Sequence, residues 1–145
     1  MREQGFTLME ILVVIALIGA MAAFAYPRLG DAITKQNVRS ARGAVVGMLA
    51  KARGTAIQRG ARTSLIFKND TLFVQSVHPV TGVVQRVGNF EDLRSRYGVD
   101  IEPTYDTCAY DPRGIGMEAA DLTVMVTKGA YSATIVVNAV GRVIQ

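Results

Sequence analysis

Apolar residues follow two different patterns over the first sixty positions. Phe6–Ala25 is almost continuously apolar and holds one charged residue, Glu10. As a helix this stretch would be about 30 Å long, which matches the apolar thickness of a bilayer. From Arg28 to about Gly60 the apolar residues recur at helical spacing, with no proline and few β-branched runs. The pattern therefore predicts one helix, apolar in 6–27 and amphipathic in 28–60.

The amphipathic part has three faces when its residues are placed at 100° intervals. The predicted core face consists of Thr34, Ala41, Ala44, Val45, Met48, Ala52 and Ala56. The predicted basic stripe consists of Arg28, Lys35, Arg39, Arg42 and Arg53. A glycine stripe of Gly43, Gly47 and Gly54 lies beside it, and is either a tolerated irregularity or a surface for close packing.

After Gly60 the pattern changes to short β-like runs separated by turn residues. One hairpin is predicted from 63–67 and 72–77, another from 122–127 and 131–137, and single strands at 83–87 and 142–144. The polar stretch 89–110 is predicted to be a long loop with room for one short strand. The fold class is therefore α+β, a long N-terminal helix packed on a small antiparallel β-sheet. Residues 61–145 would form a β-rich head, a single domain together with 28–60.

Composition excludes several functions. The chain of 145 residues is half hydrophobic and 19% charged, which argues against disorder. Its one cysteine, Cys108, excludes an intramolecular disulfide, and its one histidine, His78, leaves little room for a catalytic triad. We expect no enzyme, no catalytic residue, no metal and no cofactor. Cys108 is expected to be a buried small apolar residue, with a free reactive thiol as the alternative.

Charge is unevenly distributed along the chain. Residues 28–68 hold nine basic and one acidic residue, whereas 91–121 hold eight acidic and three basic. The basic stripe could contact an acidic region of a neighbouring subunit, remain solvated, or bind nucleic acid. The first interpretation is favoured. Oxygen donors at Asp100, Glu102, Asp106 and Asp111 do not have EF-hand spacing, so a solvated or partner-facing acidic loop is favoured over a calcium site.

The apolar stretch could be a cleaved secretory signal or a retained membrane helix. Ala23-Phe24-Ala25 offers a signal-peptidase site. However, Glu3 cancels the positive charge of Arg2 that a signal peptide needs before its apolar segment, and such a segment does not ordinarily contain a carboxylate like Glu10. The helical pattern also continues beyond Pro27, so we favour retention. A buried carboxylate at Glu10 needs a partner, and 6–25 contains no Lys or Arg. Cleavage after Gly5 would free an amine on Phe6 that a neighbouring subunit's Glu10 could pair with. A protonated carboxylate near the interface is the alternative.

The run Gly5-Phe6-Thr7-Leu8-Met9-Glu10 before an apolar stretch resembles the signal of type IV prepilins and type II secretion pseudopilins. The resemblance implies a leader, 1–5, that a prepilin peptidase removes between Gly5 and Phe6, with N-methylation of Phe6. It also implies that the helix 6–27 leaves the membrane for a filament core, where Glu10 contacts a neighbour's N-terminal amine. Gly19 and Pro27 match positions that bracket a segment which loses helix on assembly in that family.

The C-terminal half resembles the GspH/FimT group of that family. Asp111-Pro112-Arg113-Gly114 stands ahead of two strands, and Val140-Gly141-Arg142-Val143 stands near the end. GspH-type members belong to the secretion pseudopilus, whereas some FimT-type members bind DNA through Gly-Arg-x-Arg. Here isoleucine replaces the second arginine, at Ile144. The resemblance implies a minor pseudopilin of a type II secretion system.

The alternative is a DNA-binding minor pilin that uses Arg142, Arg39 and Arg42. A third class, a cargo-binding or enzymatic domain on a membrane stalk, has no residue evidence beyond the anchor. The expected partners are other pilin or pseudopilin subunits, the peptidase and the bacterial inner membrane. The N-terminus would be cytoplasmic and the head periplasmic.

Overall fold

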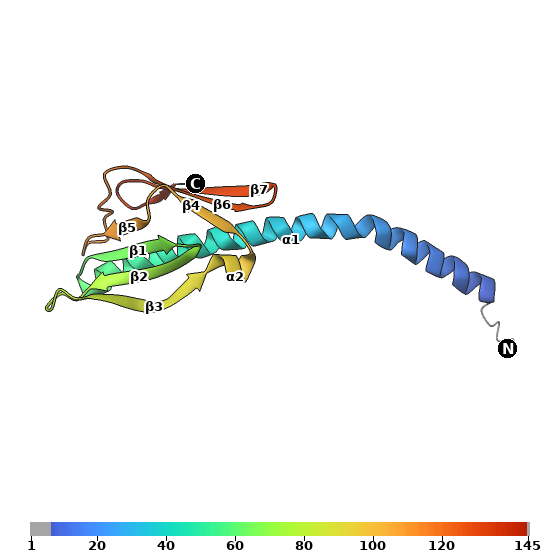
Figure 1. The fold of residues 1–145 in the computed structure, drawn as a ribbon, viewed down its shortest axis with the longest axis horizontal. Coiled ribbons are helices and arrows are strands. Elements are labelled where there is room, and N and C mark those ends of the chain that lie inside the picture. Colours follow the sequence, from blue (N-terminus) through green and yellow to red (C-terminus); the bar gives the residue numbers. More distant parts are fainter. Residues whose placement is uncertain (1–6, 145) are drawn as a thin grey trace. The chain divides into compact units, whose positions relative to one another are not determined.

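The long predicted helix is present. The computed structural model describes residues 7–144, with the side chains of 24–29 outside the description, and helix α1 spans Leu8–Arg59 (Figure 1). The hydroxyl of Thr7 accepts the Glu10 backbone N–H at 3.2 Å, so Thr7 caps the first turn. Gly60 ends the helix in the left-handed region, with φ of 59°, and the Ala61 N–H returns to the Ala56 carbonyl.

Residues up to Thr34 and residues from Lys35 onward form two compact units, described separately here. The second unit, residues 35–144, is called the head. It contains the remaining part of α1, eight strands and one short helix.

The first sheet of the head is antiparallel, with the strand order β3-β2-β1-β5. Its strands are β1 (Thr63–Lys68), β2 (Thr71–Val77), β3 (Val84–Asp92) and β5 (Thr107–Tyr110). The predicted hairpin joins β1 to β2, and both turn residues, Asn69 and Asp70, have positive φ. This conformation suits a two-residue hairpin turn, which explains why asparagine and aspartate stand there.

The second sheet has the order β4-β6-β7-β8 and is also antiparallel. Its strands are β4 (Asp100–Pro103), β6 (Leu122–Lys128), β7 (Tyr131–Val137) and β8 (Val143–Ile144). The predicted hairpin at Lys128–Ala130 is confirmed, as is the short terminal strand. The head thus has two four-stranded sheets where the sequence pattern indicated one small sheet.

The prediction of a long loop over 89–110 was wrong. This stretch contains the end of β3, helix α2 (Leu93–Tyr97), β4 and β5. The Asp92 carboxylate caps α2 by accepting the Ser95 N–H at 2.8 Å, and Gly98 ends α2 in the left-handed conformation. The polar residues that suggested a loop are caps and outward-facing strand positions, while Leu93, Val99 and Cys108 are buried.

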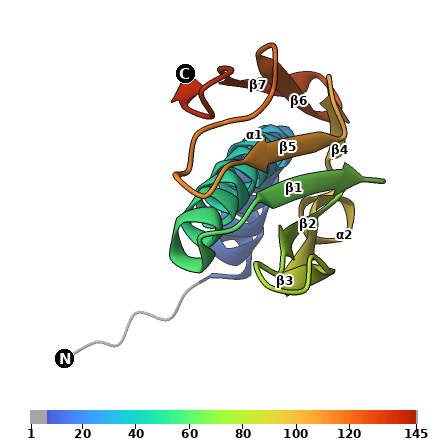
Figure 2. The same cartoon turned by 90° about the vertical axis from the view of Figure 1, so that its left-hand side faces the viewer.

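One core joins α1 to both sheets, and the strands of both sheets gather around the same part of the helix (Figure 2). Five predicted core residues of the helix are buried, namely Ala41, Val45, Met48, Ala52 and Ala56. Thr34 is only half-buried, and Val38 and Leu49 are buried although the face assignment omitted them. The largest buried side chain is Tyr110, on β5.

Candidate functional site

The first part of α1 exposes an unusually apolar surface. We call residues 8–21 the apolar segment. Its exposed large side chains include Leu8 and Met9 at the start and Met21 at the end, with exposed fractions of 79%, 72% and 73%. The others are Ile11, Leu12, Val13, Val14, Ile15, Leu17 and Ile18. An exposed surface of this kind marks an interaction with protein or lipid.

Glu10 is the carboxylate of the apolar segment. It lies in the first turn of α1, is exposed, and sits where the positive end of the helix dipole favours an anion. Among the side chains that the structure describes, no Lys or Arg forms an ion pair with it. The segment therefore presents a single acid within an apolar surface.

The structure describes only some of the other residues predicted to act in processing and assembly. Gly5 and Phe6 lie outside the described residues, as does the side chain of Pro27. Gly19 is helical, exposed, and has open space where a Cβ would be. Across the part of the chain that is described, no helix reaches the combined length and hydropathy of a membrane-crossing segment.

Four residues of the basic stripe, Lys35, Arg39, Arg42 and Arg53, lie on the part of α1 that belongs to the head, and the side chain of Arg28 lies outside the description. Arg39 and Arg53 are exposed, Arg42 is half-buried, and Lys35 stacks on the Tyr131 ring, 5.5 Å from its centroid. Among the described residues, none of these cations forms an ion pair with a carboxylate. These four residues therefore form a positive surface that no carboxylate among the described side chains compensates.

Arg53 also lines a cleft together with Arg142, which we call the arginine cleft. It has a volume of about 140 Å³ and lies between α1 and the segment before β8. Val46, Leu49, Ala50 and Val143 supply apolar lining, and Tyr110 and Gly141 complete it. Arg39 and Arg42 do not line it, so the structure does not unite all three proposed DNA-binding arginines in one site.

The turn before β8 fixes the backbone of Arg142. The Arg142 N–H donates to the side-chain oxygen of Asn138 at 2.7 Å, and its carbonyl accepts the Asn138 N–H at 2.9 Å. Gly141 has φ of 79°, and a Cβ there would lie 2.5 Å from the Tyr110 ring. Only glycine fits such an approach, which accounts for the glycine before the arginine.

The second C-terminal motif forms an adjacent turn. The Asp111 carboxylate accepts the backbone N–H groups of Arg113 and Ile115, at 2.9 and 2.8 Å, and pairs with the Arg113 guanidinium at 2.8 Å. The bond from Ile115, with the contacts to Arg113, holds the pKa of Asp111 below its usual value. The Gly116 N–H then donates to the Val140 carbonyl, so the two motifs meet in space.

The acidic residues of the head do not gather at one point. Asp100 pairs with Arg94, Glu91 with Arg96, and Asp111 with Arg113. Asp100 and Asp70 both contact the Arg94 guanidinium and raise its pKa. Within residues 7–144, no three His, Cys, Asp or Glu side chains are placed to share a metal ion.

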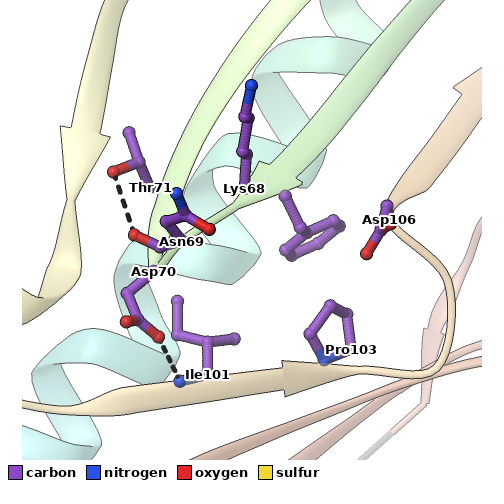
Figure 3. A pocket seen from close by; sticks show the side chains of 8 residues that line it. Lys68, Asn69, Asp70, Thr71, Ile101, Pro103 and Asp106 are labelled. Atoms are coloured by element: carbon purple, nitrogen blue, oxygen red, sulfur yellow. Dashed lines mark hydrogen bonds between the residues drawn. The ribbon is translucent and has the colours of Figure 1, made fainter.

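A polar pocket of about 330 Å³ lies between the β1–β2 turn and β4 (Figure 3). Phe67, Ile101 and Pro103 supply its apolar walls, while Lys68, Asn69, Asp70, Thr71 and Asp106 supply polar groups. The Asp70 carboxylate accepts the Ile101 N–H at 2.8 Å and pairs with Arg94 Nε at 3.1 Å. Asp70 thus ties the first sheet to the second. Sequence reasoning used Asn69-Asp70 only as a turn signal and missed this link.

The one cysteine and the one histidine of the chain both have structural roles. Cys108 is buried, as predicted, and burial raises the pKa of its thiol. Nδ1 of His78 accepts the backbone N–H groups of Val80 and Thr81, each at 3.3 Å. His78 therefore organises the β2–β3 loop.

Comparison with known families matches both halves of the chain. Residues 1–26 match the prokaryotic N-terminal methylation motif, and residues 41–141 match the type II transport protein GspH. The chain belongs to the GspH family. The family match covers both C-terminal motifs up to Gly141, and its members are structural pilin subunits.

Relatives of this GspH-family chain include fimbrial proteins of Dichelobacter nodosus. A type IV major fimbrial protein FimA is 32% identical over 122 residues, 80% of this chain and 65% of the relative. Another, a fimbrial protein, is 30% identical over 117 residues, 77% of this chain. The chain spans 62% and 65% of the length of these two relatives.

The fold matches that of a solved pilin. The type IV minor pilin FimU of Pseudomonas aeruginosa superposes with a TM-score of 0.61 at 14% identity, covering 75% of this chain and 87% of FimU. A second crystal form of FimU gives a TM-score of 0.57 at 15% identity, covering 72% of this chain and 89% of FimU. The chain therefore has the pilin fold.

Proposed function

We propose that this chain is a minor pseudopilin, a structural subunit that assembles into the periplasmic pseudopilus of a type II protein secretion system. The observation that carries the proposal is the apolar segment with its one carboxylate, Glu10, which lies within the part of the chain, residues 1–26, that matches the methylation motif. A surface of this kind needs an apolar environment, which a bilayer can supply before assembly and neighbouring helices can supply after it.

The proposed route begins with processing. A prepilin peptidase cuts between Gly5 and Phe6 on the cytoplasmic side of the inner membrane, and the new terminus on Phe6 is N-methylated. Until assembly, residues 6–27 anchor the chain and the head is periplasmic. Gly19 and Pro27 mark the helical stretch that would loosen when the subunit enters the filament, since glycine and proline cost about 1 and 3 kcal/mol within a helix.

In the proposed filament, apolar packing drives association and Glu10 sets the register. A carboxylate in an apolar core is strongly disfavoured unless a cation compensates it. The N-terminal amine of a neighbouring subunit is the cation available at that depth. Only a register that brings the two together would then be stable.

A secretion role is favoured over DNA binding by the end of the chain. Gly141-Arg142-Val143-Ile144 keeps one arginine and has an exposed isoleucine, 47% accessible, where a second arginine would add phosphate contacts. The family match to a type II transport protein supports the same choice.

The first test separates processing from assembly. Replacing Gly5 by a bulky residue should block cleavage, so the unprocessed variant should migrate more slowly on a gel. Glu10→Leu should be processed and inserted normally but should be several-fold depleted from sheared filaments, because the register contact is lost. Asp31→Leu is the matched control, since Asp31 is an exposed carboxylate later on the same helix. Normal incorporation of Glu10→Leu would remove Glu10 from the mechanism.

A further inference from the structure

The carboxylates of the head differ sharply in how they are satisfied. Asp70, Glu91, Asp100 and Asp111 pair with arginines, while Asp92, Glu118 and Asp121 accept backbone N–H groups. Among the described head residues, only Glu102 and Asp106 have neither kind of partner for their side chains. These two carboxylates are therefore free to meet an external cation.

Glu102 lies beside an apolar side chain on the outer face of the second sheet. In the β4–β6 register it stands opposite Met125, whose side chain is 41% exposed. The outward neighbours on these strands alternate with buried Val124 and Val126. Glu102 and Met125 together make a small surface that is half acidic and half apolar.

The arginine cleft offers the complementary surface. Arg53 and Arg142 bring two cations to one cleft, and neither forms an ion pair within the described part of the chain. The cleft has apolar walls. Exposed Ile144, on β8, lies two residues after Arg142. Hydrogen bonds to Asn138 fix the backbone at Arg142, so the point from which the side chain extends is set before a partner binds.

The sheet topology separates these surfaces within one chain. β4 and β8 are the opposite edges of the second sheet, three strand spacings apart. At about 4.8 Å per spacing the two strand backbones are about 14 Å apart, and Glu102 forms no ion pair with either arginine of the cleft in the described part of the chain. Two copies related by a head-to-tail repeat could bring the surfaces together, and a contact of this kind extends into a helical filament when the rotation between copies does not close a ring.

We infer that the arginine cleft of one copy receives Glu102 of a second copy, with Met125 packing near Ile144. The inference rests on the proposed filament function and deepens it by naming the contact between heads. The contact between copies is made by side chains and not by backbone pairing along β4, because the Asp70 carboxylate already accepts the Ile101 N–H at that edge. The contact would join a carboxylate on an apolar surface to the two guanidinium groups of the cleft.

The test is sedimentation of the full-length chain in detergent micelles at low and high salt. Arg142→Glu and Glu102→Arg should each weaken self-association about fivefold at low salt, and the double reversal should restore most of it. Arg62→Glu makes the same charge change at an exposed arginine outside the cleft and should have little effect. An unchanged thermal unfolding midpoint verifies that each variant is folded.

Three results would overturn the inference. In the first, the double reversal associates no better than the single variants; in the second, Arg62→Glu weakens association as much as Arg142→Glu. In the third result, Arg142→Glu abolishes binding of a labelled DNA duplex, measured by anisotropy, while self-association is unchanged. That result would make nucleic acid the occupant of the cleft. Failure of the proposed filament function is distinguishable, because it appears in the processing and incorporation of the Gly5 and Glu10 variants.

Discussion

Asp70 joins three parts of the head through one residue. Its carboxylate accepts the Ile101 N–H and pairs with Arg94, while its carbonyl accepts the Leu93 N–H at 3.0 Å. The side chain is 14% exposed, so its removal leaves the Ile101 N–H without its partner in a half-buried position. A lost hydrogen bond of this type costs about 1–3 kcal/mol.

We therefore predict that Asp70→Ala lowers the free energy of unfolding by about 2 kcal/mol. Asp70→Asn should cost less, because an amide oxygen can still accept the Ile101 N–H and asparagine tolerates positive φ. Thermal or denaturant unfolding of the full-length chain in detergent measures both. Asp106 lines the same pocket but its side chain makes no hydrogen bond there, so Asp106→Ala should leave the free energy of unfolding nearly unchanged. Equal losses for Asp70→Ala and Asp106→Ala would contradict the assigned role.

Asp111 should make the head sensitive to acid. The bond from the Ile115 N–H, together with Arg113, lowers the pKa of Asp111 in the folded chain. A carboxyl with a depressed folded pKa contributes stability above its unfolded pKa, and this is lost as the pH falls through the folded value. The window therefore lies below about pH 4.

Comparison of wild type and Asp111→Asn between pH 7 and pH 2 tests this. The variant should be less stable at neutral pH, because the ion pair with Arg113 is lost. The gap in unfolding midpoint should narrow steadily below about pH 4, where Asp111 of the wild type becomes protonated. A gap that stays constant down to pH 2 would show that the charge of Asp111 does not matter.

At the scale of elements, the turn before β8 depends on one glycine. Gly141 and Gly129 both have positive φ, of 79° and 57°. A Cβ on Gly141 would lie 2.5 Å from the Tyr110 ring, whereas Gly129 has nothing within 4 Å. Comparing the two positions therefore separates backbone strain from steric overlap.

Gly129→Ala should cost about 1 kcal/mol of unfolding free energy from the left-handed backbone alone. Gly141→Ala should cost that amount plus about 1–3 kcal/mol, because the Tyr110 ring must shift. Thermal unfolding of the two variants measures both costs. Similar costs at both glycines would mean that the Tyr110 ring moves aside at little cost. The close approach of Tyr110 would then not explain why glycine precedes Arg142.

The elements themselves were predictable to different degrees. The helix and both hairpins have strong local signals, namely helical spacing, Asn69-Asp70, and Lys128–Ala130 between alternating strands. The strands β4 and β5 have four residues each, and α2 has five. Such short elements are stabilised by tertiary partners, such as Thr63↔Tyr110 pairing between β1 and β5, which no local pattern reveals.

The candidate sites were predictable to a similarly uneven degree. Glu10 is conspicuous because one charge interrupts an apolar run, and Arg142 stands in a recognisable motif. The arginine cleft joins positions 53 and 142, and the polar pocket joins positions 68 and 106. Contacts over such sequence separations depend on strand order, which the sequence pattern did not settle. The Asp70 link was missed for the same reason.

At the scale of the whole molecule, the apolar segment and the core belong to different units. Every buried hydrophobic residue among the described positions lies at Val38 or later, and the head begins at Lys35. The exposed apolar side chains of 8–21 contribute nothing to that core. Stability of the head and association through the helix should therefore be separable properties.

We predict that a fragment of residues 35–145 folds cooperatively without detergent, with a thermal midpoint within about 5 °C of the full-length chain, since no core residue is removed. A fragment of residues 42–145 is the matched control. It lacks Val38 and Ala41, which are 3% and 0% exposed, and should lose about 2–4 kcal/mol of unfolding free energy. Circular dichroism melts of both fragments provide the measurement. If the longer fragment melts without cooperativity, the head depends on the preceding helix, and the separation of folding from assembly fails.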